Sequence, residues 1–383
     1  MADTKLGHDD SAVLLLIRED RSSTVIEREL REHGVGVETV PGAAFRERIE
    51  TATPRAIVLA TDLEHATSLC LLVRGNPALS AVPVLWCVDA LDDLIFEEAF
   101  TVGADDVLLV TNTNGLSRRL SALPPGLSSR KTLSRGTALV ADAGQQRRIV
   151  PARLLRNFGF DVEFAVDARD LADRARADRV AVVIADVDLE EGRVLAELDA
   201  VRSEGNRVPW ILRTPPKKLR AASDATRDVE GAWVSDAFAP PDNVLYAVNE
   251  ALRGPFTENR ASPRLLFGTT VAFRVAGRDT DEWGYVYNVS EGGLFIRTMA
   301  ALRPGDDAWL ELKPPRTDRR VRLEAAVVWK RPYDPATQAV APPGFGVRIT
   351  GGSETDLERY RRGYRALAAD LAGIRFSTPP KRG

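Results

Sequence analysis

Cysteine and histidine are scarce in this 383-residue chain, and their positions are Cys70, Cys87, His8, His33 and His65. Two cysteines cannot form the framework of several disulfides that stabilises small secreted domains, and so few Cys and His residues exclude a Cys/His zinc site. No run of about 18 apolar residues is present, so the sequence predicts no membrane insertion. The N-terminus, MADTKLGHDD, is acidic and polar, unlike a signal peptide. These absences predict a soluble, cytoplasmic protein.

A charge excess of one sign is also missing, since 52 Lys and Arg against 55 Asp and Glu give a net charge of −3. This net charge is distributed unevenly along the chain. Residues 1–125 carry 11 basic and 20 acidic side chains, residues 126–254 carry 20 of each, and residues 255–383 carry 21 and 15. The C-terminal third is therefore favoured for an anionic ligand. The chain lacks a concentrated basic stripe and a helix-turn-helix pattern, so we expect no nucleic-acid partner.

Two segments rich in Pro, Ser and Gly, 122–136 and 254–263, interrupt the apolar patterns and are typical of interdomain linkers. The sequences on either side of the first linker resemble each other. LREHGVGVETV begins at residue 30 and LRNFGFDVEFA at residue 155, 125 residues later. AIVLATDLE begins at 56 and VVIADVDLE at 182, while VPVLWCV begins at 82 and VPWILRT at 208. Matches in one order at one offset indicate a duplicated domain.

Each copy alternates short apolar runs with helical patterns, which is typical of parallel strands covered on both faces. The sequence therefore predicts two flavodoxin-like doubly wound α/β domains, at 11–122 and 136–253. Ligands of such sheets bind beyond the carboxyl ends of the strands.

This pattern resembles the receiver domain of response regulators. The resemblance implies acids after strand 1 that hold Mg²⁺, a phosphoacceptor Asp ending strand 3, a Thr or Ser after strand 4 and a Lys after strand 5. The first copy has Arg18 among the acids, Ala60 at the phosphoacceptor position, Val88 after strand 4 and Val110 at the Lys position. We expect no phosphorylation of this copy.

The second copy retains more of the receiver pattern: Asp142 after strand 1, Asp186 at the end of strand 3 and Thr214 at the end of strand 4. Ala143 replaces the second acid, and Asp236 stands where Lys is expected. Two interpretations stay open. Asp186 retains some phosphoacceptance in a pocket with Asp142 and Thr214, and Mg²⁺ is then required, or the domain is kept for protein interaction or dimerisation.

From Thr269 onward, six short segments alternate apolar and polar residues and are rich in aromatic and β-branched side chains. They predict a six-stranded antiparallel β-barrel. Residues 353–373 predict a C-terminal helix with Ser353 as its N-cap, and Leu357, Tyr360, Tyr364 and Leu367 lie at helical spacing for packing on the barrel.

Residues 258–374 resemble the PilZ domain, a bacterial receptor module for cyclic di-GMP. The family signature is RxxxR followed by [D/N]xSxxG. This chain has Arg260 and Arg264 in the first part, and Asn288, Ser290, Gly292 and Gly293 across the second. The resemblance implies that these six residues bind the ligand and that the barrel is of the PilZ type. Arginine can pair with phosphate or read a guanine edge, and Asn288 can both accept and donate hydrogen bonds.

The sequence thus predicts a non-enzymatic signalling protein that binds cyclic di-GMP and changes its domain arrangement or partner binding. The resemblance implies a role in motility, adhesion or polysaccharide control, with protein partners and a homodimer through the receiver-like domains. One alternative is a ligand-independent adaptor, in which Arg260 and Arg264 are solvated charges and 288–293 is a simple hairpin turn. Another is a response regulator phosphorylated at Asp186. No histidine follows His65 and no Ser/His/Asp or metal constellation is present, so catalytic residues are not expected.

Overall fold

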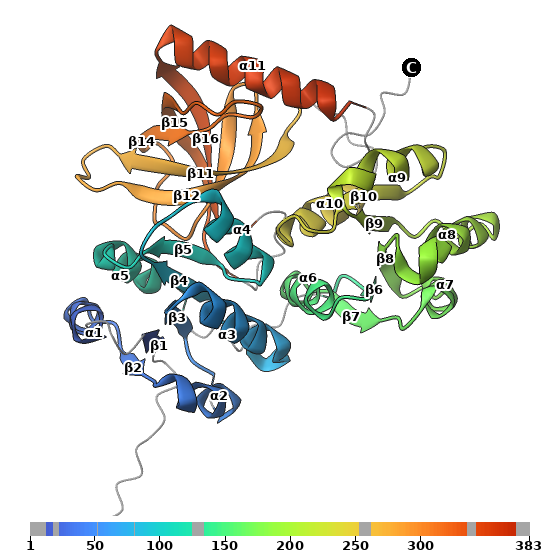
Figure 1. Ribbon diagram of the computed structural model, residues 1–383, viewed down its shortest axis with the longest axis horizontal. Coiled ribbons are helices and arrows are strands. Elements are labelled where there is room, and N and C mark those ends of the chain that lie inside the picture. Colours follow the sequence, from blue (N-terminus) through green and yellow to red (C-terminus); the bar gives the residue numbers. More distant parts are fainter. Residues whose placement is uncertain are drawn as a thin grey trace, which may run out of the picture.

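The computed structural model describes residues 13–17, 23–51, 53–79, 81–124, 134–252, 262–334 and 342–372. Two α/β domains are followed by a β-barrel, which lies across both of them (Figure 1). Among the described residues, no helix combines the length and the apolar character needed to cross a membrane.

The first α/β domain is a parallel sheet with the strand order β2-β1-β3-β4-β5, which is the flavodoxin-like order. Buried apolar residues occupy β3 along its whole length, as expected for a strand covered on both faces. The strands are β1 (Val13–Ile17), β2 (Val37–Thr39), β3 (Ala56–Ala60), β4 (Val84–Val88) and β5 (Asp106–Leu109). The helices are α1 (Ser23–Glu32), α2 (Gly42–Thr51), α3 (Leu63–Gly75), α4 (Asp93–Thr101) and α5 (Thr113–Ser121).

The second α/β domain repeats this topology. Its strand order is β10-β9-β8-β6-β7, which becomes 2-1-3-4-5 when it is read from β7 and the strands are numbered from the start of this domain. The duplication predicted from the 125-residue offset is therefore confirmed at the level of fold. The strands are β6 (Thr137–Ala141), β7 (Asp161–Phe164), β8 (Val180–Asp186), β9 (Trp210–Thr214) and β10 (Ala232–Asp236). The helices are α6 (Gln145–Asn157), α7 (Ala168–Ala175), α8 (Arg193–Ser203), α9 (Leu219–Ala225) and α10 (Asp242–Leu252).

The third domain is a closed antiparallel barrel with the order β11-β12-β13-β16-β15-β14, which confirms the predicted six strands. The strands are β11 (Leu265–Val275), β12 (Glu282–Ser290), β13 (Gly293–Arg297), β14 (Asp307–Leu312), β15 (Val321–Arg331) and β16 (Gly344–Gly352). Helix α11 (Glu354–Asp370) begins after Ser353, whose hydroxyl accepts a hydrogen bond from the Asp356 N–H. Tyr360, Tyr364 and Leu367 join the barrel core, as predicted.

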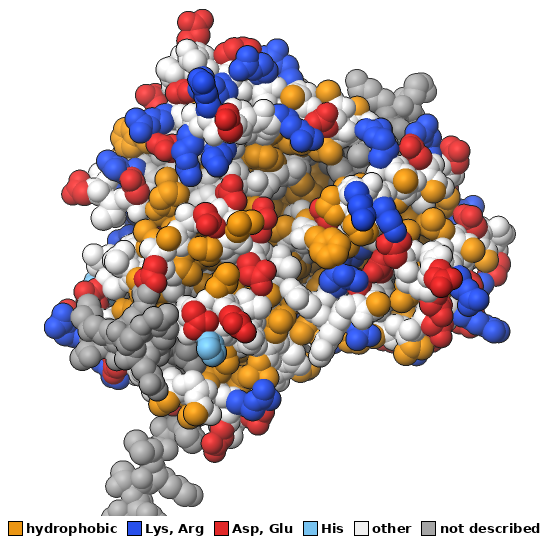
Figure 2. Space-filling view, viewed as in Figure 1, with side chains coloured by type: hydrophobic (Ala, Val, Ile, Leu, Met, Phe, Trp, Pro, Cys, Tyr) orange, Lys and Arg blue, Asp and Glu red, His pale blue; other side chains and the backbone are white. Residues whose placement is uncertain are grey.

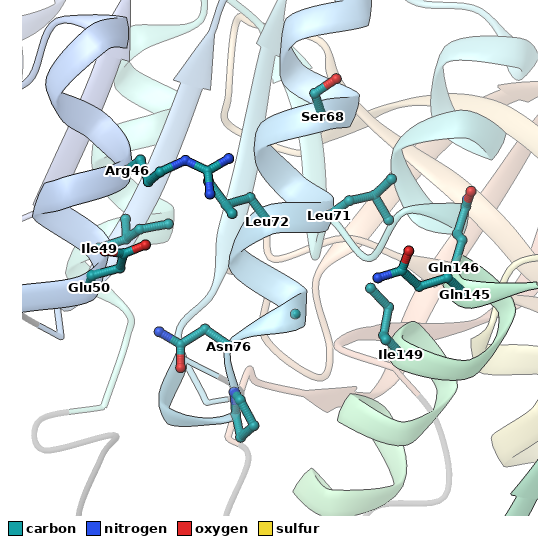
Figure 3. A pocket seen from close by; sticks show the side chains of 12 residues that line it. Arg46, Ile49, Glu50, Ser68, Leu71, Leu72, Asn76, Gln145, Gln146 and Ile149 are labelled. Atoms are coloured by element: carbon teal, nitrogen blue, oxygen red, sulfur yellow. The ribbon is translucent and has the colours of Figure 1, made fainter. Parts of the chain in front are cut away.

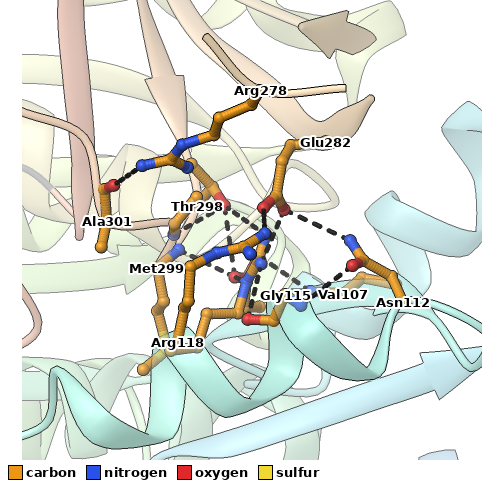
Figure 4. A network of polar contacts seen from close by, with 12 residues as sticks. Val107, Asn112, Gly115, Arg118, Arg278, Glu282, Thr298, Met299 and Ala301 are labelled. Carbon is orange, nitrogen blue, oxygen red and sulfur yellow. Dashed lines mark hydrogen bonds and ion pairs between the residues drawn. The ribbon is translucent and has the colours of Figure 1, made fainter. Parts of the chain in front are cut away.

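The first α/β domain and the barrel are joined by a buried polar network (Figure 4). Glu282, at the start of β12, accepts from Arg118 and Arg119 of α5 at 2.5 and 2.8 Å. Arg119 also donates to Asp106 of β5 at 2.6 Å, and Asp106 accepts the Met299 backbone N–H at 2.8 Å. Because Glu282, Arg119 and Asp106 are buried and mutually paired, the two domains are held in one arrangement.

Apolar packing reinforces this contact. Tyr285 of β12 lies in the same hydrophobic cluster as Phe96 and Phe100 of α4, and its ring stacks on Phe96 with centroids 5.6 Å apart. Met299 and Tyr333 of the barrel join the cluster on the other face of the first sheet. The barrel thus completes the hydrophobic core of the first domain over its α4, β5 and α5 face.

One barrel residue, Arg297 at the end of β13, contacts both α/β domains. Its guanidinium pairs with Asp242 of α10, donates to the Ala104 carbonyl at 2.9 Å and lies 3.5 Å from the ring centroid of Phe100. Arg153 of α6 joins the second domain to the first by pairing with Asp105 at 3.1 Å. The three domains therefore meet at a buried ionic junction.

Candidate ligand-binding site

The motif from Asn288 to Gly293 forms the hairpin between β12 and β13. Ser290 pairs with Gly293 across it, and the Ser290 hydroxyl donates to the Gly293 carbonyl at 3.1 Å. Gly293 packs so closely on β16 that a Cβ atom would overlap the Val347 carbonyl, whereas a Cβ on Gly292 would meet nothing within 4 Å. Only the second glycine is therefore required by the packing of the barrel. The hairpin-turn interpretation is thus correct as local structure, and it does not exclude a binding role.

A β-bulge turns Asn288 to the outside of the barrel. The register with β13 shifts between Val286 and Asn288, while Val286 and Val289 both belong to the barrel core. Tyr287 and Asn288 consequently face outward together. The Asn288 side chain is 6% exposed, and among the described residues its amide group has no hydrogen-bond partner. A shielded amide of this kind favours a polar ligand.

Arg264 comes directly before β11 and lies at the same end of the barrel. The next residue, Leu265, pairs with Val289, which places Arg264 beside Ser290 on the neighbouring strand. The Ser262 hydroxyl accepts the Glu291 N–H at 3.1 Å, so this segment is attached to the hairpin. The structure thereby brings Arg264 together with the hairpin residues Asn288 to Gly293. Arg260, the other arginine of the predicted motif, lies outside the described residues.

Two tyrosines of α11 hold this end of the barrel in place. The Tyr360 hydroxyl donates to the carbonyls of Ser290 and Gly293 at 2.9 and 3.0 Å, and the Tyr364 hydroxyl donates to the Pro263 carbonyl at 2.8 Å. Sequence reasoning assigned these tyrosines only to packing. Their hydroxyls could not be placed on the motif before the barrel closed.

An aromatic strip flanks Asn288 on the outer surface of the barrel. Phe295, the β13 partner of Asn288, stacks on Trp329 with centroids 4.8 Å apart and meets Tyr287 edge to face at 6.0 Å. Tyr246 of α10 continues the strip beside Tyr287 at 6.3 Å. Flat apolar groups next to an amide and an arginine suit a ligand with planar bases.

At the carboxyl edge of the second sheet, Asp142 and Asp186 are brought together as predicted, but an arginine lies between them. Arg147 donates to Asp142 at 2.9 and 3.0 Å and to Asp186 at 3.0 Å. Arg213 adds a second guanidinium, 3.5 Å from Asp142. Burial raises the pKa of Asp186 above its ordinary value, and neighbouring Asp142 adds to the shift. Sequence reasoning missed Arg147, although its place five residues after Asp142 was a usable signal.

This arrangement does not fit a divalent cation. Two guanidinium groups already supply the positive charge that such a cation would bring, and like charges repel at these distances. Within the described ranges, no three His, Cys, Asp or Glu side chains are placed to hold a metal. The predicted pocket residue Thr214 is buried, and its hydroxyl has no partner among the described residues. The edge of this sheet is thus organised around two arginines, the partly exposed Arg147 and the buried Arg213.

The corresponding edge of the first domain holds no such cluster among the described residues. Ala60 is buried at the end of β3, and Asp62 is the N-cap of α3, where it accepts the His65 N–H at 3.0 Å. Arg18 lies outside the described residues. The role of Asp62 in capping explains its position two residues beyond the expected phosphoacceptor.

An open cleft of about 840 Å³ separates α2 and α3 of the first domain from α6 of the second (Figure 3). Its floor is apolar, with Ile49, Leu71, Leu72 and Ile149, and polar side chains such as Arg46 and Gln146 stand at its rim. None of the predicted site residues lines it.

Fold and site together define a three-domain protein in which two flavodoxin-like domains hold a barrel with a conspicuous polar hairpin. Residues 258–365 match the sequence profile of the PilZ domain. The C-terminal domain therefore matches the PilZ family, and two α/β domains with flavodoxin-like strand order precede it. No curated protein matches the chain.

Solved structures similar to parts of the chain include both domain types. The inhibitor of motility MotI/DgrA from Bacillus subtilis is 13% identical with a TM-score of 0.26, over 30% of this chain and 54% of that one. The chain thus spans about half the length of that inhibitor. The PilZ domain of YcgR from Escherichia coli, solved with cyclic di-GMP, is 15% identical with a TM-score of 0.24, over 30% and 95%. The receiver domain of NtrX from Brucella abortus is 20% identical with a TM-score of 0.28, over 31% and 99%.

Proposed function

We propose that this protein is a non-enzymatic bacterial signalling protein that binds cyclic di-GMP at the β12–β13 hairpin of its PilZ domain. The observation that carries the proposal is the Asn288 side chain, which a bulge turns outward beside Arg264 and leaves without a hydrogen-bond partner among the described residues. The PilZ domain of YcgR was solved with this nucleotide.

The chemistry of the ligand suits these side chains. Cyclic di-GMP carries two phosphates and two guanines, and a guanidinium can pair with a phosphate through two parallel hydrogen bonds or with guanine O6 and N7. Arg260 and Arg264 take this role, while Asn288 and Ser290 hold the guanine edge. Gly292 allows the ligand to approach the backbone, since the space beside it is open.

Ligand binding joins the linker before β11 to the hairpin and thereby fixes the second α/β domain against the barrel. The resulting surface is recognised by a protein partner in the cytoplasm. Motility, adhesion or polysaccharide output is the process we propose, and the similarity to an inhibitor of motility is consistent with it. Ligand binding acts as a switch only when the partner binds the ligand-free and the ligand-bound protein with different affinities.

Isothermal titration calorimetry with cyclic di-GMP tests the proposal on the full chain. The wild type should bind, and Arg264→Ala should abolish binding. Arg322→Ala is the matched control, because Arg322 lies on β15, is 84% exposed and pairs with Glu311 on the barrel wall. Absence of binding heat in the wild type, or equal loss in the control, would contradict the proposal.

A ligand-independent adaptor is the second candidate, and the buried network between the first domain and the barrel favours it. Glu282, Arg119 and Asp106 fix these domains without any ligand. Such a protein would give no binding heat with cyclic di-GMP and would still capture its partner. In either case a homodimer through the α4, β5 and α5 face of the first domain would have to displace the barrel.

A further inference from the structure

Helix α10 of the second α/β domain lies against the barrel surface that carries the candidate site (Figure 1). At its first residue, the Asp242 carbonyl accepts the Tyr287 hydroxyl at 2.8 Å, and the Asp242 carboxylate pairs with Arg297. Tyr287 is the bulge residue next to Asn288, and Arg297 is at the far end of the strand that begins at Gly293. The helix is thus attached to both strands of the binding hairpin.

One turn later, α10 reaches the arginine of the motif itself. Tyr246 lies four residues after Asp242 and therefore on the same helix face. Its hydroxyl donates to the Arg264 backbone carbonyl at 3.3 Å, and its ring meets Tyr287 edge to face at 6.3 Å. A residue of the second domain therefore contacts the backbone of the motif arginine.

The two α/β domains are joined to the barrel in different ways. The core clusters of the first domain include barrel residues such as Tyr285 and Met299. The two main clusters of the second domain contain residues of that domain alone, and only Tyr246 packs against a small barrel cluster of Tyr287 and Phe295. Its contacts with the barrel at Asp242, Tyr246 and Arg220 are ionic, hydrogen-bonded or aromatic. A domain that shares only a small apolar cluster with its neighbour can shift with less loss of buried surface.

We infer that α10 forms one wall of the ligand site and that Tyr246 is a positioning residue, which holds Arg264 in place for the ligand and transmits occupancy to the second α/β domain. This inference rests on the proposed binding of cyclic di-GMP. Figure 2 shows hydrophobic side chains in the hollow between the barrel and the second α/β domain.

The inference predicts that Tyr246 variants weaken the affinity for cyclic di-GMP by more than a loss of stability alone would. Loss of one neutral hydrogen bond typically changes an equilibrium about fivefold, so Tyr246→Phe should raise the dissociation constant of cyclic di-GMP about fivefold. Tyr246→Ala removes the ring contact with Tyr287 as well and should raise it by more than tenfold. A merely structural tyrosine would lower the unfolding temperature and leave the affinity of the folded protein unchanged.

The test uses the full chain with calorimetry, thermal unfolding and hydrogen exchange of residues 242–252, with and without cyclic di-GMP. Tyr333→Phe is the matched control, because the Tyr333 hydroxyl also bridges domains: it accepts from Arg153 of the second domain and donates to the Ala81 carbonyl of the first, at the ionic junction and not at the Arg264 carbonyl. We expect the ligand to slow exchange in α10 of the wild type and of Tyr333→Phe, and the Tyr246→Ala variant to lose this effect.

Two outcomes overturn the inference. If both Tyr246 variants bind cyclic di-GMP as the wild type does, Tyr246 does not position Arg264, although the proposed function stands. If Tyr246→Phe and Tyr333→Phe weaken binding equally, the effect is a general loosening of the domains. A wild type that does not bind at all overturns the proposed function itself, and this result differs from the other two.

Discussion

Arg119 of the first α/β domain donates a hydrogen bond to Glu282 of the barrel at 2.8 Å, and both side chains are 1% exposed. The residues are 163 positions apart in sequence. A buried charge that loses its partner is strongly destabilising, whereas the intact pair is only weakly stabilising. This pair therefore acts mainly by specifying how the barrel is seated on the first domain.

Glu282→Gln should destabilise the protein by about 3 kcal/mol, because the buried Arg119 loses one of its two carboxylate partners and the partly exposed Arg118 also loses its pairing with Glu282. Denaturant unfolding measures the effect. Glu311→Gln is the control, since Glu311 pairs with the largely exposed Arg322 and should change stability by less than about 1 kcal/mol. Equal effects of the two substitutions would show that Glu282 does not stabilise the interface between the first domain and the barrel.

The same carboxylate predicts a pH dependence. Burial raises the pKa of Glu282, but the guanidinium of Arg119 and its hydrogen bonds outweigh this and hold the pKa below the ordinary value of 4.5. The folded state therefore binds a proton less readily than the unfolded state, and the stabilisation is present above pH 4.5 and lost as the pH falls through the lower, folded pKa. Unfolding temperatures from pH 7 down to pH 3 should fall less steeply for Glu282→Gln than for the wild type.

Gly293→Ala should cost about 2 kcal/mol and abolish ligand binding, because a Cβ atom would overlap the Val347 carbonyl and separate β13 from β16. Gly292→Ala is a close control within the same hairpin, since its Cβ would meet nothing within 4 Å and should leave stability unchanged. Thermal unfolding of both variants measures the effect on strand packing, and cyclic di-GMP calorimetry measures the effect on ligand binding. A stable Gly293→Ala protein would show that the strand contact tolerates the methyl group.

Asp186 should stay unmodified when the wild type is treated with acetyl phosphate and Mg²⁺, because Arg147 lies between the two carboxylates where the cation would be needed. Intact-mass spectrometry detects the phosphoryl group. Asp186→Asn provides the baseline, and Arg147→Ser tests whether removal of the guanidinium permits modification. A phosphorylated wild type would instead support the response-regulator alternative.

Arg297→Met should destabilise the protein by about 3 kcal/mol, since it leaves Asp242 buried without its cation. Burial already raises the pKa of Asp242, and Arg297 opposes that shift. The double variant Arg297→Met with Asp242→Asn should be more stable than Arg297→Met alone. A double-mutant cycle in denaturant measures the coupling, and strictly additive effects would show that the two residues do not interact.

Much of the fold could be predicted because its signals are local. Apolar runs separated by helical patterns predict parallel strands, and the 125-residue offset predicts that one topology occurs twice. Ser353 was recognised as an N-cap because capping depends on residues three positions apart. The hairpin motif could be found for the same reason, since Asn288, Ser290 and Gly293 lie within six consecutive positions.

The remaining features depend on residues that only folding brings together. Arg147 could not be placed between Asp142 and Asp186 until β6 and β8 were adjacent, and the outward turn of Asn288 required the register shift against β13. Likewise, Arg297 pairs with Asp242 from 55 positions away and contacts Ala104 from 193. The sequence alone therefore determined the fold classes and the position of the hairpin motif, whose patterns are local in the chain. Tertiary structure decided which charges neutralise one another and which domain lies against the hairpin, because long-range pairing depends on distances that no spacing in the chain encodes.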